Sequence, residues 1–436
     1  MEFPKIVVTG LGAVTALGHS MSETFDNLCA GKSGINEIPW LREAGFPVYI
    51  GAEVKGMESL FEVYPQAEKH NSRKLAYALK AMDEACQQAG LESFQGLRAG
   101  IFMGVETSRI PFSSSFDIFN LCGREKGRVD YRLFGEKCRN LISRDHIQNK
   151  FPFFLPGFLA GTHAISGPVL ATSNACASSN YATGEALRHL RSGLVDVAVV
   201  GSSDEMIDEY MITGFSLLRA LSQNNSDPQG SSRPFDMKRD GFVLGEGGAI
   251  LILETLEHAL KRGAKPICEL AGYGSSSDGE KITACNRQGA WLMRAMECAI
   301  EDGGMTLSQI GYVNAHGTST RLNDLSEAMA IHSLFGESEN PPLVNSSKSM
   351  LGHTVAAAGA IEAAVTITSM VRKVFHPNRN LSQSDTRFPL NYCGLKAVEG
   401  NVLGALSNSC GFSGGNSCIA FRVLDDSNNY PSGDLS

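Results

Sequence analysis

One cysteine of this chain lies where a nucleophile could be presented. An apolar run closes in "SGPVLATSNAC" (166–176), and "ASSNYATGEALRHLRSG" (177–193) continues with helical spacing. A strand-to-helix turn can lift one side chain out of the backbone. A thiol there meets the positive end of the helix dipole, which lowers its pKa, and free N–H groups can bind an oxyanion. Cys176 is therefore a candidate nucleophile, and a buried structural cysteine is the competing interpretation.

Two histidines stand in comparable surroundings. His316 follows an apolar stretch in "VNAHGTSTRLNDLSE", and His353 follows another in "VNSSKSMLGHTVAAAGAIEAA", where Lys348 precedes it and Glu362 comes after. The small residues around both leave room for a site, whereas the remaining histidines are interpreted as core or surface residues. One thiolate and two imidazoles suit zinc or copper as well as acyl transfer. Because no fourth ligand or supporting ligand motif is evident, we expect acyl chemistry and no metal.

The composition describes an ordinary folded chain. It has 436 residues, of which 43% are hydrophobic and 19% charged, and its net charge of -8 gives no general attraction to nucleic acid or an anionic membrane. Eleven dispersed cysteines without a CxxC pair indicate reduced thiols in the cytoplasm. We find no signal peptide and no apolar run long enough to span a membrane. Together with the net charge, this indicates neither nucleic acid nor membrane as a partner.

The order of segments predicts a duplicated α/β protein. A strand-and-glycine pattern, "IVVTGLG", returns as "ICELAGYG", a helix in "AMDEACQQAGL" returns as "AMECAIEDGGM", and "AGIFMGVETS" returns as "IGYVNAHGTST". We expect one half at 1–262 with the cysteine, a second at 263–425 with both histidines, and a disordered tail at 426–436. Residues 109–155 predict a partly helical excursion that serves as a lid or a partner surface.

Several ordered motifs resemble the β-ketoacyl-acyl carrier protein synthases of the thiolase-like superfamily, above all the elongating ketosynthase II group. The motifs are "VVTGLGAVTALG", "LCAGKSGI", "ALSQNNSDPQGSSRPFDMKRDGFVLGEGGAILILE", "NAHGTSTRLND", "KSMLGHTVAAAGAIEA" and "SNSCGFSGGN". The resemblance covers nearly the whole chain. It implies a five-layered αβαβα fold built from two similar halves.

The resemblance also implies roles. Cys176 would accept the acyl group, and His316 with His353 would bind a malonyl thioester and promote its decarboxylation. No bound cofactor is required, since the substrates ride on the phosphopantetheine of an acyl carrier protein. Four further positions match supporting residues of the family. Lys348 and Glu362 match residues that support the second histidine and the hydrogen-bond network of the site, and Thr318 and Thr320 match residues that contact the phosphopantetheine arm. Phe412 matches the gating phenylalanine, whose N–H joins that of Cys176 in the oxyanion hole.

The chain departs from the family pattern near the gate. Asn174 replaces a usual threonine, and Cys410 and Ser413 replace a phenylalanine and a glycine of the usual Phe-Gly-Phe-Gly-Gly loop. We therefore expect an unsaturated, aromatic or polyketide-type acyl chain at least as readily as a saturated fatty acyl chain. Pathway and chain length stay open between fatty acid and type II polyketide or polyene synthesis.

Three other functions are compatible with some of these motifs. Cys410-Gly411 invites a two-cysteine thiolase mechanism, which "HGTST" disfavours. A chain length factor-like partner subunit would lack the nucleophile, and an acyltransferase that never condenses would not need both histidines. We expect a homodimer, or a heterodimer with a ketosynthase-like or chain length factor subunit. Basic candidates for docking the acidic carrier are Lys69, Arg73, Lys74, Arg124, Lys126 and Arg128.

Overall fold

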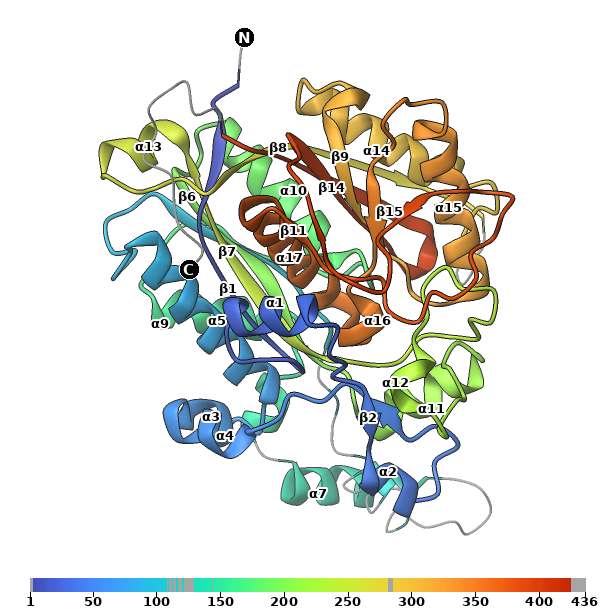
Figure 1. Ribbon diagram of the computed structural model, residues 1–436. Helices are drawn as coiled ribbons and strands as arrows, with labels where there is room; N and C mark the ends of the chain where they lie inside the picture. Colours follow the sequence, from blue (N-terminus) through green and yellow to red (C-terminus); the bar gives the residue numbers. More distant parts are fainter. Residues whose placement is uncertain are drawn as a thin grey trace.

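The computed structural model describes residues 3–424, except 108, 110–111, 113–114, 117–119, 121–128, 143 and 281–284. Within these residues, the main element is one mixed sheet with the strand order β12-β10-β9-β14-β15-β8-β1-β7-β6-β4-β5 (Figure 1). Its strands are β1 (Ile6–Thr15), β4 (Ala99–Gly104), β5 (Val169–Thr172), β6 (Val197–Glu205), β7 (Glu246–Thr255), β8 (Cys268–Ser277), β9 (Ile310–Asn314), β10 (Leu343–Asn345), β12 (Asn391–Tyr392), β14 (Gly404–Cys410) and β15 (Gly415–Arg422). Two short ribbons pair β2 (Asn36–Glu37) with β3 (Ile50–Gly51) and β11 (Val374–Phe375) with β13 (Val398–Glu399).

The sheet is built twice from the same topology. In the first half the strands lie side by side in the order β5-β4-β6-β7-β1, and in the second half in the order β10-β9-β14-β15-β8. If the strands of each half are numbered along the chain, both orders read third, second, fourth, fifth, first. In each half the three strands at the outer end are parallel and the remaining two pairings are antiparallel. The two halves join where β1 pairs with β8. The predicted duplication is therefore confirmed, with its repeated segments on β1 and β8, on the following helices, and on β4 and β9.

Helices cover both faces of each half and give five layers. Helix α5 (Arg73–Ala89) covers the outer face of the first half, α10 (Ser178–Arg191) and α17 (Ala358–Arg372) lie between the halves, and α14 (Ala290–Asp302) with α15 (Arg321–Phe335) covers the outer face of the second half. Separate apolar cores fill the three helical layers.

The remaining helices are shorter than the main helices of these layers. They are α1 (Met21–Cys29), α2 (Pro39–Glu43), α3 (Met57–Val63), α4 (Pro65–Lys69), α7 (Tyr131–Leu141), α8 (Arg144–Gln148), α9 (Phe154–Thr162), α11 (Glu209–Leu217), α12 (Pro228–Ser231), α13 (Leu256–Lys261) and α16 (Lys348–Leu351), with 3-10 turns η2 (Leu307–Gln309), η3 (Val355–Ala357) and η4 (Phe412–Gly414).

Local signals set the ends of these helices. The Ser72 side chain accepts the N–H of Leu75 at the start of α5, and Gly90 ends that helix in the left-handed region at φ 64°. The central helix α17 is buried on nearly all sides because it lies between the two halves of the sheet. This burial explains its apolar composition.

The other segment predictions have mixed outcomes. The 109–155 excursion contains α7, α8 and the start of α9, so its helical part is confirmed, while much of it and the tail at 426–436 lie outside the described residues. The boundary between 262 and 263 stays a prediction. Contrary to the expectation from sequence, one described segment, Val355–Arg372, has the length and hydropathy of a membrane span, but 89% of it is buried inside the protein as a core helix.

Candidate active site

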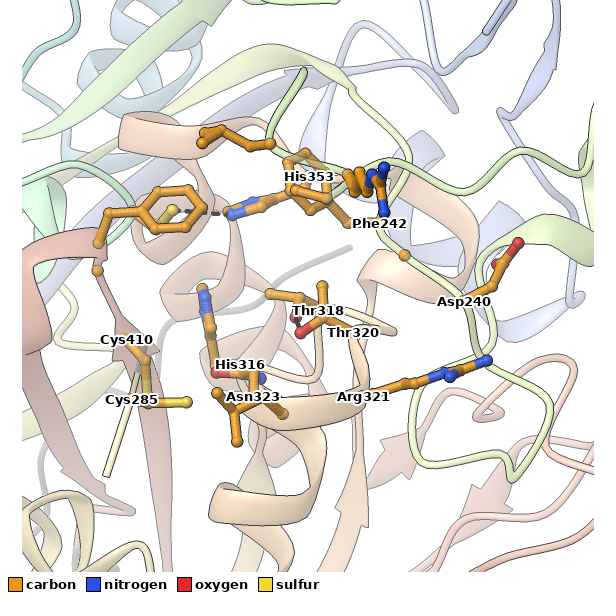
Figure 2. Close-up of a pocket in the computed structure, with 18 residues that line it drawn as sticks. Asp240, Phe242, Cys285, His316, Thr318, Thr320, Arg321, Asn323, His353 and Cys410 are labelled. Atoms are coloured by element: carbon orange, nitrogen blue, oxygen red, sulfur yellow. Dashed lines mark hydrogen bonds between the residues drawn. The ribbon is translucent and has the colours of Figure 1, made fainter. Parts of the chain in front are cut away.

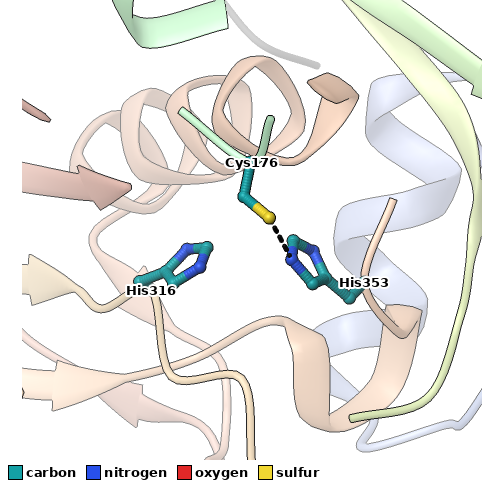
Figure 3. Close-up of side chains that lie close together, drawn as sticks. All are labelled: Cys176, His316 and His353. Atoms are coloured by element: carbon teal, nitrogen blue, oxygen red, sulfur yellow. Dashed lines mark hydrogen bonds between the residues drawn. The ribbon is translucent and has the colours of Figure 1, made fainter. Parts of the chain in front are cut away.

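Cys176 lies in the turn between β5 and α10, as expected. Ala175 before it adopts a left-handed backbone with φ 49°. Ser178 at the start of α10 holds the turn, because its hydroxyl donates to Ala175 O at 2.6 Å and accepts the N–H of Asn174 at 2.8 Å. The thiol is buried and points toward two histidines of the second half (Figure 3).

His353 is the nearer histidine, with Nε2 3.0 Å from Cys176 Sγ. Its backbone is fixed on both sides, since its N–H donates to Val243 O at 2.7 Å and its carbonyl accepts the N–H of Gly245 at 3.0 Å. The N–H of Val355 donates to His353 Nδ1 at 3.3 Å. Burial and the charge of Lys348 hold the pKa of His353 well below its usual value, so the ring is neutral. A neutral ring that accepts at Nδ1 carries its proton on Nε2, which faces the sulfur.

His316 reaches the same point from the loop after β9. Glu327 of α15 holds this loop by accepting the N–H groups of His316 and Gly317, each at 2.8 Å. The ammonium of Lys348 lies 3.2 Å from His316 Nδ1 and is paired with the carboxylate of Glu362. An ammonium only donates, so this contact places the His316 proton on Nε2 as well. Burial, with smaller effects of Lys348 and His353, keeps its pKa well below the usual value.

The structure agrees with only part of the role expected of Lys348. The resemblance assigned it, with Glu362, to supporting the second histidine and the hydrogen-bond network of the site; its Nζ belongs to that network, but the ring that it contacts is that of His316. His353 receives a backbone donor at the corresponding nitrogen instead. The cause is tertiary: Lys348 begins α16, whose fold directs the side chain back toward the loop after β9. Glu362 from α17 then neutralises the buried ammonium, and burial raises the pKa of Glu362 to about 7.

The expected lowering of the Cys176 pKa is wrong. Burial raises the pKa of this thiol to about 12, although Lys348 and the backbone N–H groups of Phe412 and Cys176 oppose the shift. Desolvation of a fully buried thiolate outweighs the helix terminus and the nearby donors. The two N–H groups nevertheless converge at Cys176, which is the arrangement expected for an oxyanion hole.

Cys176, His316 and His353 also have the residue types of a metal site. Sγ of Cys176 and one ring nitrogen each of His316 and His353 lie within 4.8 Å of one another. A ligating histidine ordinarily donates its other ring N–H to a carboxylate or carbonyl. Here both Nδ1 atoms accept from donors, so the Nε2 lone pairs that a metal requires are protonated. The donor set therefore does not fit a metal and fits an acceptor such as a thioester oxygen.

A cavity of about 330 Å³ adjoins these residues, and Figure 2 shows its lining. Thr318 and Thr320, whose hydroxyls are 3.0 Å apart, line it on the side of the exposed Asp240 and Arg321. Cys410 lies beyond His316, beside Cys285. The structure thus brings all the predicted site residues together. Cys410, the second cysteine that a thiolase mechanism would need, lies in the cavity wall, and the thiol that contacts His353 Nε2 is that of Cys176.

Phe412 completes the wall beside the thiol. Its ring stacks on Phe215 with centroids 6.0 Å apart, Phe215 meets Phe242 at 5.1 Å, and Phe242 meets the His353 ring at 5.3 Å. Sequence reasoning missed this aromatic row, and also Glu327 and Cys285. Glu327 is the last residue of the motif "HGTSTRLNDLSE". Its position in the helix that follows the His316 loop was the one feature of the sequence that could have indicated a contact with that loop. Nothing local marked Phe215 or Cys285.

The proposed docking cations are largely occupied or outside the described residues. Arg73 forms an ion pair with Glu246 at 2.6 Å, and buried Lys74 donates to Glu106 O at 2.7 Å, so neither is free for a partner. Only Lys69 among the described candidates is exposed. Arg124, Lys126 and Arg128 lie outside the described residues.

Comparison with known proteins agrees with this geometry. The sequence pattern of the beta-ketoacyl synthase N-terminal domain matches residues 4–259, and that of the C-terminal domain matches residues 267–382. The chain is 35% identical to chloroplastic 3-oxoacyl-[acyl-carrier-protein] synthase II of Arabidopsis thaliana over 427 residues, which cover 96% of this chain and 76% of that protein.

Two solved structures extend the comparison. A type II polyketide synthase acyl carrier protein in complex with its ketosynthase, bound to a hexaketide, includes a chain with a TM-score of 0.86 and 31% identity, covering 97% of this chain and all of that chain. The ishigamide ketosynthase/chain length factor gives 0.83 and 29%, with 97% and 100% covered. The chain belongs to the beta-ketoacyl synthase family. It is an acyltransferase of the 3-oxoacyl-[acyl-carrier-protein] synthase type, which condenses an acyl thioester with a malonyl unit.

Proposed function

We propose that Cys176 carries the growing acyl chain and that His316 and His353 hold the malonyl thioester. The observation that carries this assignment is the pair of Nε2–H groups beside one thiol, each fixed by a donor at Nδ1. Two neutral N–H donors favour an oxygen that gains negative charge. They do so without transferring a proton.

The chemistry proceeds in two stages. First, Cys176 Sγ attacks the acyl thioester, the carrier thiol leaves with the thiol proton, and the N–H groups of Cys176 and Phe412 bind the transient oxyanion. Second, the malonyl thioester loses CO2, and its enolate oxygen is held by the two histidines. The enolate carbon attacks the acyl carbonyl on Cys176. The product is two carbons longer, and the thiolate is released and reprotonated.

The substrates arrive, in this proposal, on the phosphopantetheine of an acyl carrier protein. Thr318 and Thr320 line the cavity between the histidines and the side where Asp240 and Arg321 are exposed. Their hydroxyls can form hydrogen bonds there with the amides and the hydroxyl of such an arm. A ketosynthase of similar structure is described in complex with its carrier protein, which supports this partner. The enzyme binds no further cofactor in this scheme and acts in the cytoplasm.

A dimer is the proposed assembly, either of two copies or with a chain length factor-like subunit. The edge strand β5 supports it, because within the described part of the chain no further strand pairs with its outer side, and Val169 is 44% exposed. An unpaired apolar edge favours strand pairing with another chain. Two related solved proteins are named as ketosynthases with a chain length factor. Sedimentation of the purified chain, alone and with candidate subunits, decides between the two assemblies.

The acyl chain is proposed to be unsaturated, aromatic or of polyketide type. The small thiols Cys410 and Cys285 form one end of the cavity wall, which leaves room beside Phe412. Intact-mass measurement of Cys176 loading across a panel of acyl carrier thioesters, with and without malonyl donor, tests the whole proposal. Equal or better loading with saturated chains would refute the chain type. Loading without condensation would favour the acyltransferase alternative, and no loading would favour a partner subunit.

A further inference from the structure

A carboxylate outside the site lies next to the turn that follows His353. Asp204, near the end of β6, is buried, and its Oδ2 accepts the N–H of Ala357 at 3.2 Å. Ala357 is the last residue of η3, and the same N–H also approaches Thr354 O at 3.2 Å. Strand β6 thus contacts the turn through a side chain that no step of the proposed mechanism uses.

That turn is strained where it meets His353. Val355 has φ 51°, and a β-branched side chain is a genuine outlier in the left-handed region. Such a conformation persists only where the surroundings over-determine it. Its consequence is specific, because the N–H of Val355 is the donor at His353 Nδ1. If the turn relaxes, the histidine loses the contact that sets its tautomer.

The charges around Asp204 explain why a carboxylate can lie there. Burial raises the pKa of Asp204 to about 7, while Lys74 and Arg109 favour its ionised form and Glu106 opposes it. Both forms of this carboxyl are therefore present near neutral pH, and either form offers an oxygen that can accept the N–H of Ala357.

We propose that Asp204 is a positioning residue that holds the strained Val355 turn and thereby keeps the His353 Nε2–H directed at Cys176. The chain of contacts runs from Asp204 Oδ2 to Ala357 N, through η3 to Val355 N, and from there to His353 Nδ1. Asp204 touches neither substrate nor thiol in this scheme. The inference rests on the proposed function for its kinetic consequence.

Two substitutions of similar shape isolate the hydrogen bond. Asp204→Asn keeps an acceptor oxygen, whereas Asp204→Leu fills nearly the same space without one. We expect Asp204→Leu to lower kcat of condensation at least about tenfold and Asp204→Asn to stay within about threefold, since small misplacements of catalytic groups are costly. KM for the malonyl thioester should change little. Ser203→Ala, at the neighbouring position of β6, is the matched control, because the Ser203 hydroxyl donates to Lys74 O of α5 at 2.7 Å and not to the turn.

A second readout does not depend on turnover. The His353 N–H stabilises the thiolate of Cys176, so the pH profile of Cys176 alkylation by iodoacetamide should move to higher pH in Asp204→Leu and stay in place in Asp204→Asn and Ser203→Ala. Equal profiles and equal kcat for the Asn and Leu variants would overturn the inference. Condensation missing from the unmutated protein would instead overturn the proposed function and leave the alkylation comparison intact.

A third arm covers poor folding of Asp204→Leu. In a Val355→Gly background the strain is absent, because glycine adopts a positive φ freely. Asp204→Ala, which also removes the acceptor, should lower kcat at least about tenfold in the unmutated background and within about threefold in the Val355→Gly background, as expected of coupled positions. The same fold-loss in both backgrounds would show that Asp204 does not act through the turn.

Discussion

The nucleophile and one of its histidines occupy equivalent places in the two halves of the chain. Cys176 lies between the third strand and the central helix of the first half, β5 and α10. His353 lies between β10 and α17, the same pair of elements in the second half. The second half inserts α16 and η3 at this position, where the first half has a short turn. One duplicated position thus presents a thiol in one copy and a hydrogen-bond donor in the other.

The loops after the second strands differ as well. The loop after β9 carries His316 and is clamped by Glu327, whereas the equivalent loop after β4 leads to Glu106, whose backbone oxygen binds Lys74. Both histidines therefore come from the second half. Neither half contains a complete site, and the contact between α10 and α17 brings the thiol to the donors.

The largest expected effect separates the two cysteines of the cavity. Cys176→Ala should abolish acyl loading, because no other thiol lies within hydrogen-bond distance of a histidine Nε2 among the described residues. Cys410→Ala should leave loading within about threefold, since burial holds its pKa well above the usual value and it only shapes the wall. Intact-mass analysis with one acyl carrier thioester measures both. A label on Cys410 in the Cys176→Ala protein would contradict the assignment.

The next effect concerns the two histidines. His316→Ala and His353→Ala should each lower malonyl decarboxylation by about 10²–10³-fold, the range seen when a donor to a developing oxyanion is removed. Release of CO2 from a malonyl thioester measures this step apart from loading. Glutamine at position 353 is the control, because its amide can offer an N–H where Nε2–H was. Wild-type decarboxylation in either alanine variant would remove that histidine from the donor pair.

A smaller effect concerns the buried ion pair behind His316. Lys348→Met leaves Glu362 without its charge partner, and breaking a buried pair in this way costs about 3–5 kcal/mol of unfolding free energy. The double variant Lys348→Met with Glu362→Gln should regain much of that stability, yet stay slow because His316 lacks its donor. Denaturant unfolding and turnover are measured on the same samples. Full activity in the stable double variant would separate Lys348 from the site chemistry.

The mildest prediction is the pH dependence of the thiol. With its pKa raised to about 12, Cys176 is protonated at neutral pH, and the thiolate fraction grows with rising pH. The rate of its alkylation should therefore climb roughly tenfold for each pH unit between 7 and 9, as a group titrating above that range requires. Peptide mapping distinguishes Cys176 from the other thiols. A plateau below pH 8 would show a thiolate already formed in the unliganded site.

Much of the site was predictable because its residues are marked locally. A cysteine before a helix of small residues and histidines after apolar strands carry their signal within a few positions of the chain. The Asp204–Ala357 contact and the aromatic row from Phe412 to His353 had no such signal. Their members are distant in sequence, and only packing of β6 against η3, or of separate loops around the cavity, brings them together.

The sequence by itself determined the duplicated order of strands and helices, the family, and the candidates Cys176, His316 and His353, because these depend on periodicity and on short motifs. Tertiary structure alone decided that Lys348 contacts His316, that both rings carry their protons on Nε2, and that burial raises the pKa of Cys176. Those properties arise from which groups surround a side chain and how far water is excluded from it. Both are set only when the two halves close on each other.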